Sequence, residues 1–241
     1  MSRPFINRQL IKQSAFDSGA LTPLVSLIHT IKISGEYLGT LYLNEQAVGN
    51  FHLTVEDRAP NTQVNIDLAG LNSGSPRQAS LRTPDQYKLR TNGHAVFYVS
   101  AGRGGYALTL HRVGSADKRA VLDSRALQDG DVFLVALLRP GTYRLLNART
   151  GQESKVTVGY PEQGKKAITN LALTPVEIGV RGFSNPGMEI QSGQGLAVQC
   201  NAPARLRLEL VEPIERQAQV EIKPGAPRPG KVTWRKSGLI R

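Results

Sequence analysis

Residues 87–113 read YKLRTNGHAVFYVSAGRGGYALTLHRV, and this stretch decides the fold class. Ala95–Ser100 is rich in β-branched and aromatic residues, and Tyr106, Leu108 and Leu110 alternate with other residues after it. Successive side chains of a strand point to opposite faces, so this alternation predicts half-buried strands rather than a helix. The glycines of residues 102–105 predict a turn, and two strands joined by such a turn predict a β-hairpin.

The same two-residue period extends outward in both directions. Towards the N-terminus, Leu41, Leu43, Phe51 and Leu53 alternate around an expected turn at residues 48–50. Towards the C-terminus, strands are predicted over residues 132–138, 142–146, 155–158, 168–173, 176–180, 188–190, 196–200, 206–211 and 220–222. Residues 20–33, the most apolar stretch, are expected to form a buried strand or docking segment, and only residues 118–127 are predicted as a short helix.

A weak internal repeat accompanies these strands. Residues 188–213, MEIQSGQGLAVQCNAPARLRLELVEP, follow the order of residues 87–113: a short strand, a polar turn with glycine, an apolar strand, a break and an alternating strand. Either the chain contains a true duplication, or two sets of three strands resemble one another by pattern alone. The sequence leaves both readings open.

The predicted fold class is all-β, with two tandem antiparallel β-sandwich-like domains and extended N- and C-terminal arms. The many Gly and Pro residues, 24 and 14, favour short strands and turns. The expected divisions are an N-terminal arm and docking segment (1–33), a β-sandwich domain (34–160, with a possible internal boundary at 71–84), a smaller β domain (161–222) and a basic C-terminal arm (223–241).

Positive charge is concentrated at the two ends. Residues 1–16 contain three basic residues and residues 222–241 contain six, and neither stretch contains an acid. The remaining 21 basic and 19 acidic residues leave the middle of the chain at +2, out of a total of +11. The sequence therefore describes a nearly neutral body with two basic arms, which points to contact with a partner.

No sequence motif names a reaction. The chain lacks a Gly-x-Ser-x-Gly elbow, and residues 102–105 lack the Gly-Lys-Ser/Thr ending of a phosphate loop. Asp129 and Asp131 flank a turn glycine, so turn formation explains them as well as acid–base chemistry does. His94 and His111 could face each other across the predicted hairpin, but without a third ligand. We therefore expect no enzyme activity, no catalytic residues, no metal and no cofactor.

The strand pattern, with residues 139–143 entering a late strand and Cys200 further on, resembles the cupredoxin-like sandwiches. That resemblance ends at the metal, because a blue-copper site needs a cysteine and two histidines, and all four histidines precede Cys200. Cys200 is predicted to be a small buried hydrophobic residue.

The N-terminus does not resemble a secretory signal, because Gln9, Gln13, Ser14 and Asp17 interrupt any apolar core. A single cysteine excludes an internal disulfide framework. The expected location is intracellular, or inside a particle assembled in the cell, and no membrane span is expected.

The resulting hypothesis is a non-enzymatic structural subunit of a larger assembly, such as a virion, a tail or a similar particle. The partners would be other copies of the chain or other subunits, contacted through the arms. The alternative is a module that binds a polyanion, such as nucleic acid, or a carbohydrate. The residues expected to make the contacts are Arg3, Phe5 and Arg8 in the first arm, and Arg228, Lys231, Trp234, Arg235 and Lys236 in the second.

Overall fold

The computed structural model describes residues 8–72, 83–117, 119–161 and 173–215. Within these ranges the chain is nearly all β, as predicted, and its two helices, α1 (Arg8–Lys12) and α2 (Leu68–Leu71), are short. The first half contains β1 (Ala15–Asp17), β2 (Val25–Ile31), β3 (Gly35–Leu43), β4 (Gln46–Glu56), β5 (Gln63–Asp67), β6 (Asp85–Arg90), β7 (Gly93–Tyr98) and β8 (Tyr106–Arg112). The second half contains β9 (Leu122–Asp123), β10 (Val132–Ala136), β11 (Gly141–Asn147), β12 (Gln152–Gly159), β13 (Thr174–Gly179), β14 (Gly182–Phe183), β15 (Gly187–Gln191), β16 (Gly195–Cys200) and β17 (Leu206–Pro213).

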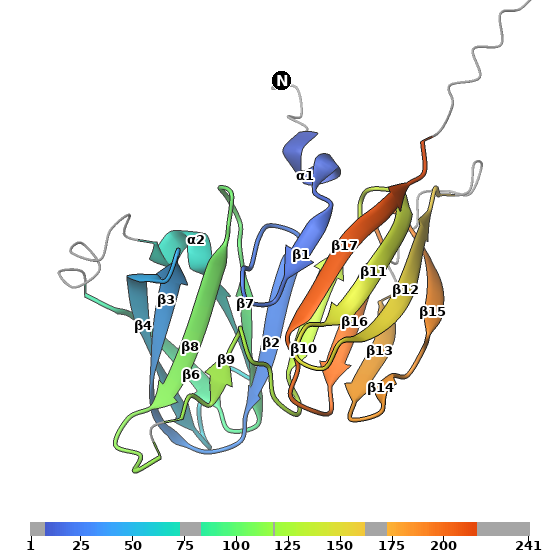
Figure 1. Cartoon of the computed structure of the whole chain (residues 1–241). Coiled ribbons are helices and arrows are strands. Elements are labelled where there is room, and N and C mark those ends of the chain that lie inside the picture. The colour runs from blue at the N-terminus through green and yellow to red at the C-terminus, as the bar shows by residue number, and fades with distance from the viewer. Residues whose placement is uncertain (1–7, 73–82, 118, 162–172, 216–241) are drawn as a thin grey trace, which may run out of the picture.

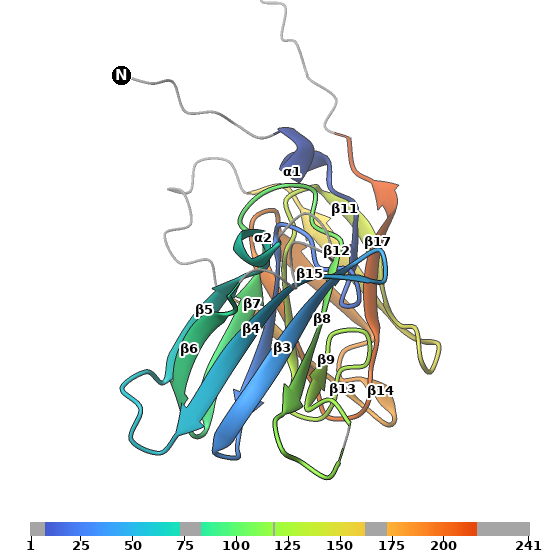
Figure 2. The same ribbon diagram turned by 90° about the vertical axis from the view of Figure 1, so that its left-hand side faces the viewer.

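The described strands form three sheets (Figure 1). An N-terminal sheet has the order β6-β4-β3-β8-β9, and a C-terminal sheet has the order β1-β17-β11-β12-β15. The third, which we name the shared sheet, has the order β14-β13-β16-β10-β2-β7-β5 and so takes strands from both halves of the chain. Figure 2 shows the same strands from the side of the N-terminal sheet.

One continuous set of buried side chains holds the sheets together. It extends from Phe16 to Leu208 and includes the fully buried Phe51, Phe97 and Phe133. Phe51 packs edge-on against Tyr87, with ring centroids 5.9 Å apart, and meets Phe97 at 6.0 Å. Since burial of an aromatic side chain contributes about 2 kcal/mol or more, these residues connect the N-terminal sheet firmly to the shared sheet.

The two halves repeat the same topology. In each half a hairpin opens one sheet (β3–β4 and β11–β12), and a parallel partner extends it (β6 on β4, β15 on β12). In the shared sheet, β5 pairs parallel to β7 as β13 does to β16, and β2 pairs antiparallel to β7 as β10 does to β16. The segments 87–113 and 188–213 therefore occupy equivalent places, and duplication is the better of the two readings of the sequence.

Individual side chains follow the repeat. Tyr37 and Tyr143 are both buried near the start of a hairpin, two residues after a glycine. The Tyr37 hydroxyl donates to the carbonyl of Ile33 at 2.6 Å, and the Tyr143 hydroxyl donates to the carbonyl of Arg139 at 2.8 Å. Burial raises the pKa of both phenols, that of Tyr143 to about 12. Each phenol therefore stays protonated and remains a donor at neutral pH.

The connections depart from the sequence predictions in two places. β7 and β8 lie in different sheets, so residues 95–113 do not form a hairpin, and His94 and His111 do not face each other across one. The first hairpin turns at Asn44 and Glu45, both left-handed (φ 50° and 63°), and not at residues 48–50. Gly49 lies inside β4, where a Cβ would come within 2.3 Å of the Leu71 carbonyl oxygen, so close packing and not a turn requires this glycine.

The helix predicted over residues 118–127 is wrong for the described part of that range. Residues 122–123 form β9, and Asp123 and Ser124 then accept backbone hydrogen bonds from Arg125 and Leu108. Side chains that bond to nearby backbone in this way compete with helix formation.

The prediction of antiparallel sheets is also only partly correct, because the four pairs β4–β6, β5–β7, β12–β15 and β13–β16 are parallel. Strands on the two sides of the expected domain boundary at residue 160 are hydrogen-bonded neighbours, as in β12–β15 and β10–β16. Residues 15–31, which belong to the expected N-terminal arm, contribute β1 and the interior strand β2.

The left-handed backbone that precedes the equivalent strands β2 and β10 can be tested at Gly130. Gly130 precedes β10 with φ 88°, and Leu24, which precedes β2, has φ 73°. A Cβ at Gly130 would meet nothing within 4 Å, so Gly130→Ala should cost only the left-handed backbone penalty, about 1–2 kcal/mol in the free energy of unfolding measured with urea. Gly179→Ala is the matched control, because it has equal space and no left-handed φ. Equal stability of the two variants would contradict this account.

Candidate docking site

Most residues predicted to contact a partner lie outside the described residues. This applies to Arg3 and Phe5 and to Arg228, Lys231, Trp234, Arg235 and Lys236. Arg8 is the first residue of α1. The structure instead shows the places where both arms join the body, and these define the candidate docking site.

Both ends of the described chain meet at one end of the body. α1 lies beside the end of β17 in both views (Figures 1 and 2). The Leu210 amide donates to the Ser14 carbonyl at 2.7 Å, and this bond continues the pairing of β1 with β17. Beyond β17, the Ile214 amide donates to the Pro140 carbonyl at 3.2 Å, and the Tyr160 hydroxyl donates to the Ile214 carbonyl at 3.0 Å.

A hollow of about 670 Å³ lies between these two ends. It mixes apolar and charged side chains, and its lining comprises Ile11, Lys12, Leu138, Arg139, Pro140, Tyr160, Ser192, Pro213, Ile214 and Glu215. Ile11 and Ile214 are 46% and 41% exposed. Exposed large apolar side chains gathered in a polar rim are typical of a protein contact site. We name this hollow with its lining the docking groove.

A second feature, not predicted above, is a motif that occurs twice where the chain crosses between its two halves. Asp17-Ser18-Gly19-Ala20-Leu21 and Asp123-Ser124-Arg125-Ala126-Leu127 share four of five residues. β1, which leads into the first half, pairs with β17 of the second, and β9, which leads into the second half, pairs with β8 of the first. Each half therefore completes a sheet of the other, and the two motifs are the crossover points.

The serine of each motif bonds to the opposite half. The Ser18 amide donates to the Leu206 carbonyl at 2.9 Å, and the Leu206 amide donates back to Ser18 Oγ at 3.2 Å. Ser124 exchanges the same two bonds with Leu108, each at 3.0 Å. Both serines are fully buried. These bonds therefore fix the crossing strands where water cannot replace a lost partner.

The leucine of each motif bonds to its own half. The Leu21 amide donates to the Tyr106 carbonyl at 2.7 Å, and the Ala204 amide donates to the Leu127 carbonyl at 3.0 Å. The chain thus passes from one half to the other within the two residues between serine and leucine. At the first crossing these are Gly19 and Ala20, and at the second they are Arg125 and Ala126.

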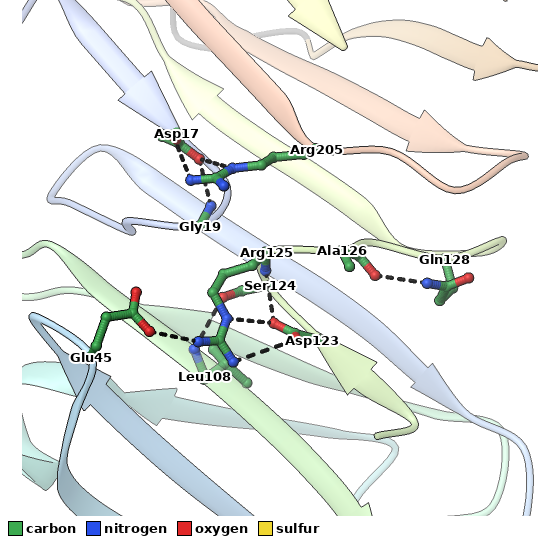
Figure 3. Close-up of polar contacts among 10 residues, drawn as sticks. All are labelled: Asp17, Gly19, Glu45, Leu108, Asp123, Ser124, Arg125, Ala126, Gln128 and Arg205. Atoms are coloured by element: carbon green, nitrogen blue, oxygen red, sulfur yellow. Dashed lines mark hydrogen bonds and ion pairs between the residues drawn. The ribbon is translucent and has the colours of Figure 1, made fainter. Parts of the chain in front are cut away.

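Charged groups surround the crossover (Figure 3). Asp17 accepts from Arg205 Nη2 at 3.3 Å and from Arg207 Nε at 2.9 Å. Arg125 bonds Asp123 at 3.0 Å, bonds Glu45 at 3.2 Å and lies 5.2 Å from the centroid of the Tyr42 ring. The hydrogen bond to Asp123 is the main cause that raises the pKa of the Arg125 guanidinium. Because these guanidinium groups already bind carboxylates, the charges of the cluster are paired with one another and are not free for a partner.

A buried acid–base pair lies where β2 meets β10. His29 Nδ1 and Asp131 Oδ1 are 2.6 Å apart, and the other Asp131 oxygen accepts from the Gln128 amide at 2.7 Å. Asp131 is fully buried, and the His29 side chain is 13% exposed. Sequence reasoning treated Asp131 as a turn residue and did not pair it with His29, because 102 residues separate them.

Cys200 is buried, as predicted. Burial, with the charges of Asp131 and Asp129, raises the pKa of its thiol to about 12, so it is unreactive as a thiol at neutral pH. Among the described residues, no three His, Cys, Asp or Glu side chains are grouped so that they could hold a metal ion. Neither described helix has the length and apolar character needed to cross a bilayer.

Comparison with known proteins shows a partial similarity. The chain is 35% identical over 158 residues to the anhydro-N-acetylmuramic acid kinase of Methylobacterium nodulans. The match covers 63% of this chain and 39% of that kinase, so the chain spans about two fifths of the length of the curated relative it matches. No protein-family model matches the chain, and no solved structure matches it.

This similarity contradicts the prediction that the chain is not an enzyme, because the relative is named as a kinase. The chain contains no short motif, such as a phosphate loop, that indicates a kinase. A similarity spread over 158 residues lies outside what such motifs detect.

The crossover bonds can be tested by removing one hydroxyl at a time. Ser18→Ala and Ser124→Ala each leave a backbone amide without its acceptor in a buried place, so each should lower the free energy of unfolding by about 1–3 kcal/mol. Ser115→Ala is the control, since the Ser115 hydroxyl also accepts a hydrogen bond from a backbone amide, that of Asp117, but in an exposed turn. Urea unfolding should rank both buried variants well below the control, and equal values would contradict the role assigned to the motif.

Proposed function

We propose that this chain is a β-sheet subunit of a larger assembly and that it docks to its neighbours through the end of the body that bears the two arms. The observation that carries the proposal is the meeting of α1 and the end of β17 at the docking groove. Residues 1–16, which include α1, and residues 222–241 together hold nine of the eleven net positive charges. Charge on the arms and exposed apolar side chains in the groove together suit a partner with an acidic, partly apolar surface.

The body is suited to this role because its two halves support one another. We propose two β-sandwich-like units that share the seven-stranded sheet and are held by the crossover, so that the docking end is presented on a rigid body. The central pairing of β2 with β10 joins the units edge to edge. A virion, a tail or a similar particle is the class of assembly proposed, by analogy of architecture alone.

Within the arms, the proposed contact residues are those that carry a positive charge or an aromatic ring. Trp234 lies next to Arg235 and Lys236, and tryptophan and arginine are favoured anchors of protein interfaces. The same residues would suit a polyanion such as nucleic acid, since base stacking and phosphate neutralisation use the same groups. The partners favoured here are other copies of the chain or other subunits.

Removal of the arms tests this proposal. A chain without residues 1–7 and 216–241 should remain folded, because the described core extends from Phe16 to Leu208, and it should associate more weakly because it lacks the charged arms. Sedimentation velocity of the full chain and of the shortened chain over a hundredfold range of concentration would measure this. A full chain that stays monomeric at every concentration, and that binds DNA with a steep dependence on salt, would establish the polyanion alternative instead.

A second function is favoured by a separate observation, the similarity to a kinase. We propose as this second candidate that the chain takes part in phosphoryl transfer to an anhydro sugar of the kind named for that relative. Phosphoryl transfer depends on holding the phosphates and activating an attacking hydroxyl. In the described residues, His29 with Asp131 has the chemistry of a base, although the pair lies mostly buried between β2 and β10.

Phosphoryl transfer predicts ADP formation from ATP that depends on added anhydro-N-acetylmuramic acid and on Mg²⁺. His29→Gln removes the imidazole and should lower the rate at least tenfold. His94→Gln should leave the rate unchanged, because the His94 ring on β7 bonds only the Thr30 hydroxyl among the described contacts. A coupled ADP assay measures both rates. Absence of sugar-dependent ADP formation in the full chain would remove this candidate.

A further inference from the structure

We propose that residues 8–18, which contain α1 and β1, form an exchangeable segment that can occupy the β17 edge of a second copy of this chain. The partner named is therefore the chain itself, and the surface is the edge of β17. This inference rests on the proposed function, for which it supplies a mechanism of subunit contact.

The Gln13 side chain donates a hydrogen bond to the Thr22 hydroxyl of its own half, and the pairing of β1 is confined to a small surface. The strand pairing sets Ala15 opposite Glu209, Phe16 opposite Leu208 and Asp17 opposite Arg207. Phe16 is 3% exposed, and Asp17 binds two arginines of the second half. Every one of these partners of β1 lies on β17 or directly before it. A second copy presents the same β17, so exchange preserves each of these contacts.

The hinge for exchange is short and is defined by its two anchors. Ser18 is bonded to Leu206 of the second half, and Leu21 is bonded to Tyr106 of the first half. Only Gly19 and Ala20 lie between them. Glycine permits backbone conformations that other residues avoid, and the equivalent position at the other crossover is Arg125. The first crossover is therefore the one whose sequence allows the chain to take a new direction.

Without residues 8–18, the β17 edge of the C-terminal sheet would lack its strand partner. β17 has two neighbours in the sheet, β11 and β1. When β1 leaves, β17 exposes a row of unpaired amides and carbonyls, which is a template for a strand from another chain. Exchange of an identical element between copies is a low-cost route to association, because the β1 of one copy forms the same hydrogen bonds on the β17 of the other.

The chain already contains this arrangement once, between its own halves. β9 leaves the second half to complete the edge of β8 in the first, just as β1 leaves the first to complete β17. β9 is joined to β8 through residues 113–121 and stays local. β1 and β17 lie at opposite ends of the chain, so nothing in the covalent connection requires that they come from the same molecule.

Cross-linking between two different variants tests the proposal directly. One full-length chain carries Ala15→Cys and the other, made longer by a tag, carries Glu209→Cys. The native Cys200 is fully buried and does not compete. If β1 is exchanged, oxidation of the mixture gives a disulfide-linked pair with one chain of each length, and the yield rises with protein concentration. The variant with both cysteines in one chain shows that the geometry allows the bond.

Glu153→Cys in place of Glu209→Cys is the matched control. Both glutamates pair with Arg144 and have similar exposure, 50% and 46%, but only Glu209 faces Ala15. Cross-linking equal to that of the control, or absent from an associated sample, overturns the exchange while the docking proposal stands. A sample that is monomeric at every concentration overturns both. A yield of the disulfide-linked mixed pair well above the yield of the control supports the exchange.

Discussion

The amides of Leu108 and Leu206 lie on strands whose edges are completed by the opposite half of the chain, and each donates to a buried serine hydroxyl. A buried amide without an acceptor costs about 1–3 kcal/mol, a large fraction of the stability of a domain. Ser18 and Ser124 therefore determine where each crossing strand stops and where it turns back to its own half. The positions of β1 and β9, and with β1 the position of the docking end, follow from these two crossings.

The crossings also explain why the two halves form one body. A simple pair of tandem domains is joined by one linker and has a small interface. Here each half donates a strand to the other, and β2 and β10 join at the centre of the shared sheet. The halves differ where they meet: Gly19 lies beside the Arg125 side chain, with only 3.1 Å between an added Cβ and Arg125 Cγ. A side chain in place of Gly19 would compete with Arg125 for this space.

The strands were predictable from the sequence because alternation is a local property. Val64 and Ile66, or Leu206 and Leu208, mark a buried face without reference to the rest of the chain. Pairing was not predictable in this way, since β7 and β8 are neighbours in sequence and lie in different sheets. The crossover was visible as Asp-Ser-x-Ala-Leu repeated at an offset of 106 residues, but only a comparison of the chain with itself finds it. No local sequence pattern indicates the pair of His29 and Asp131. His29 lies on β2 of the first half, and Asp131 directly precedes β10 of the second half, so only the folded chain brings them together.

The antiparallel pairing of β1 with β17 has a mechanical consequence. The chain enters β1 and leaves β17 at the same end of this pair, since Ala15 faces Glu209 and Asp17 faces Arg207. Tension between the two arms would therefore load the hydrogen bonds one after another, beginning near Ser14 and Leu210, and would not load them together in shear. Strands peeled in this manner separate at low force. A subunit pulled by its arms would release β1 first, while the sheets behind it stay intact.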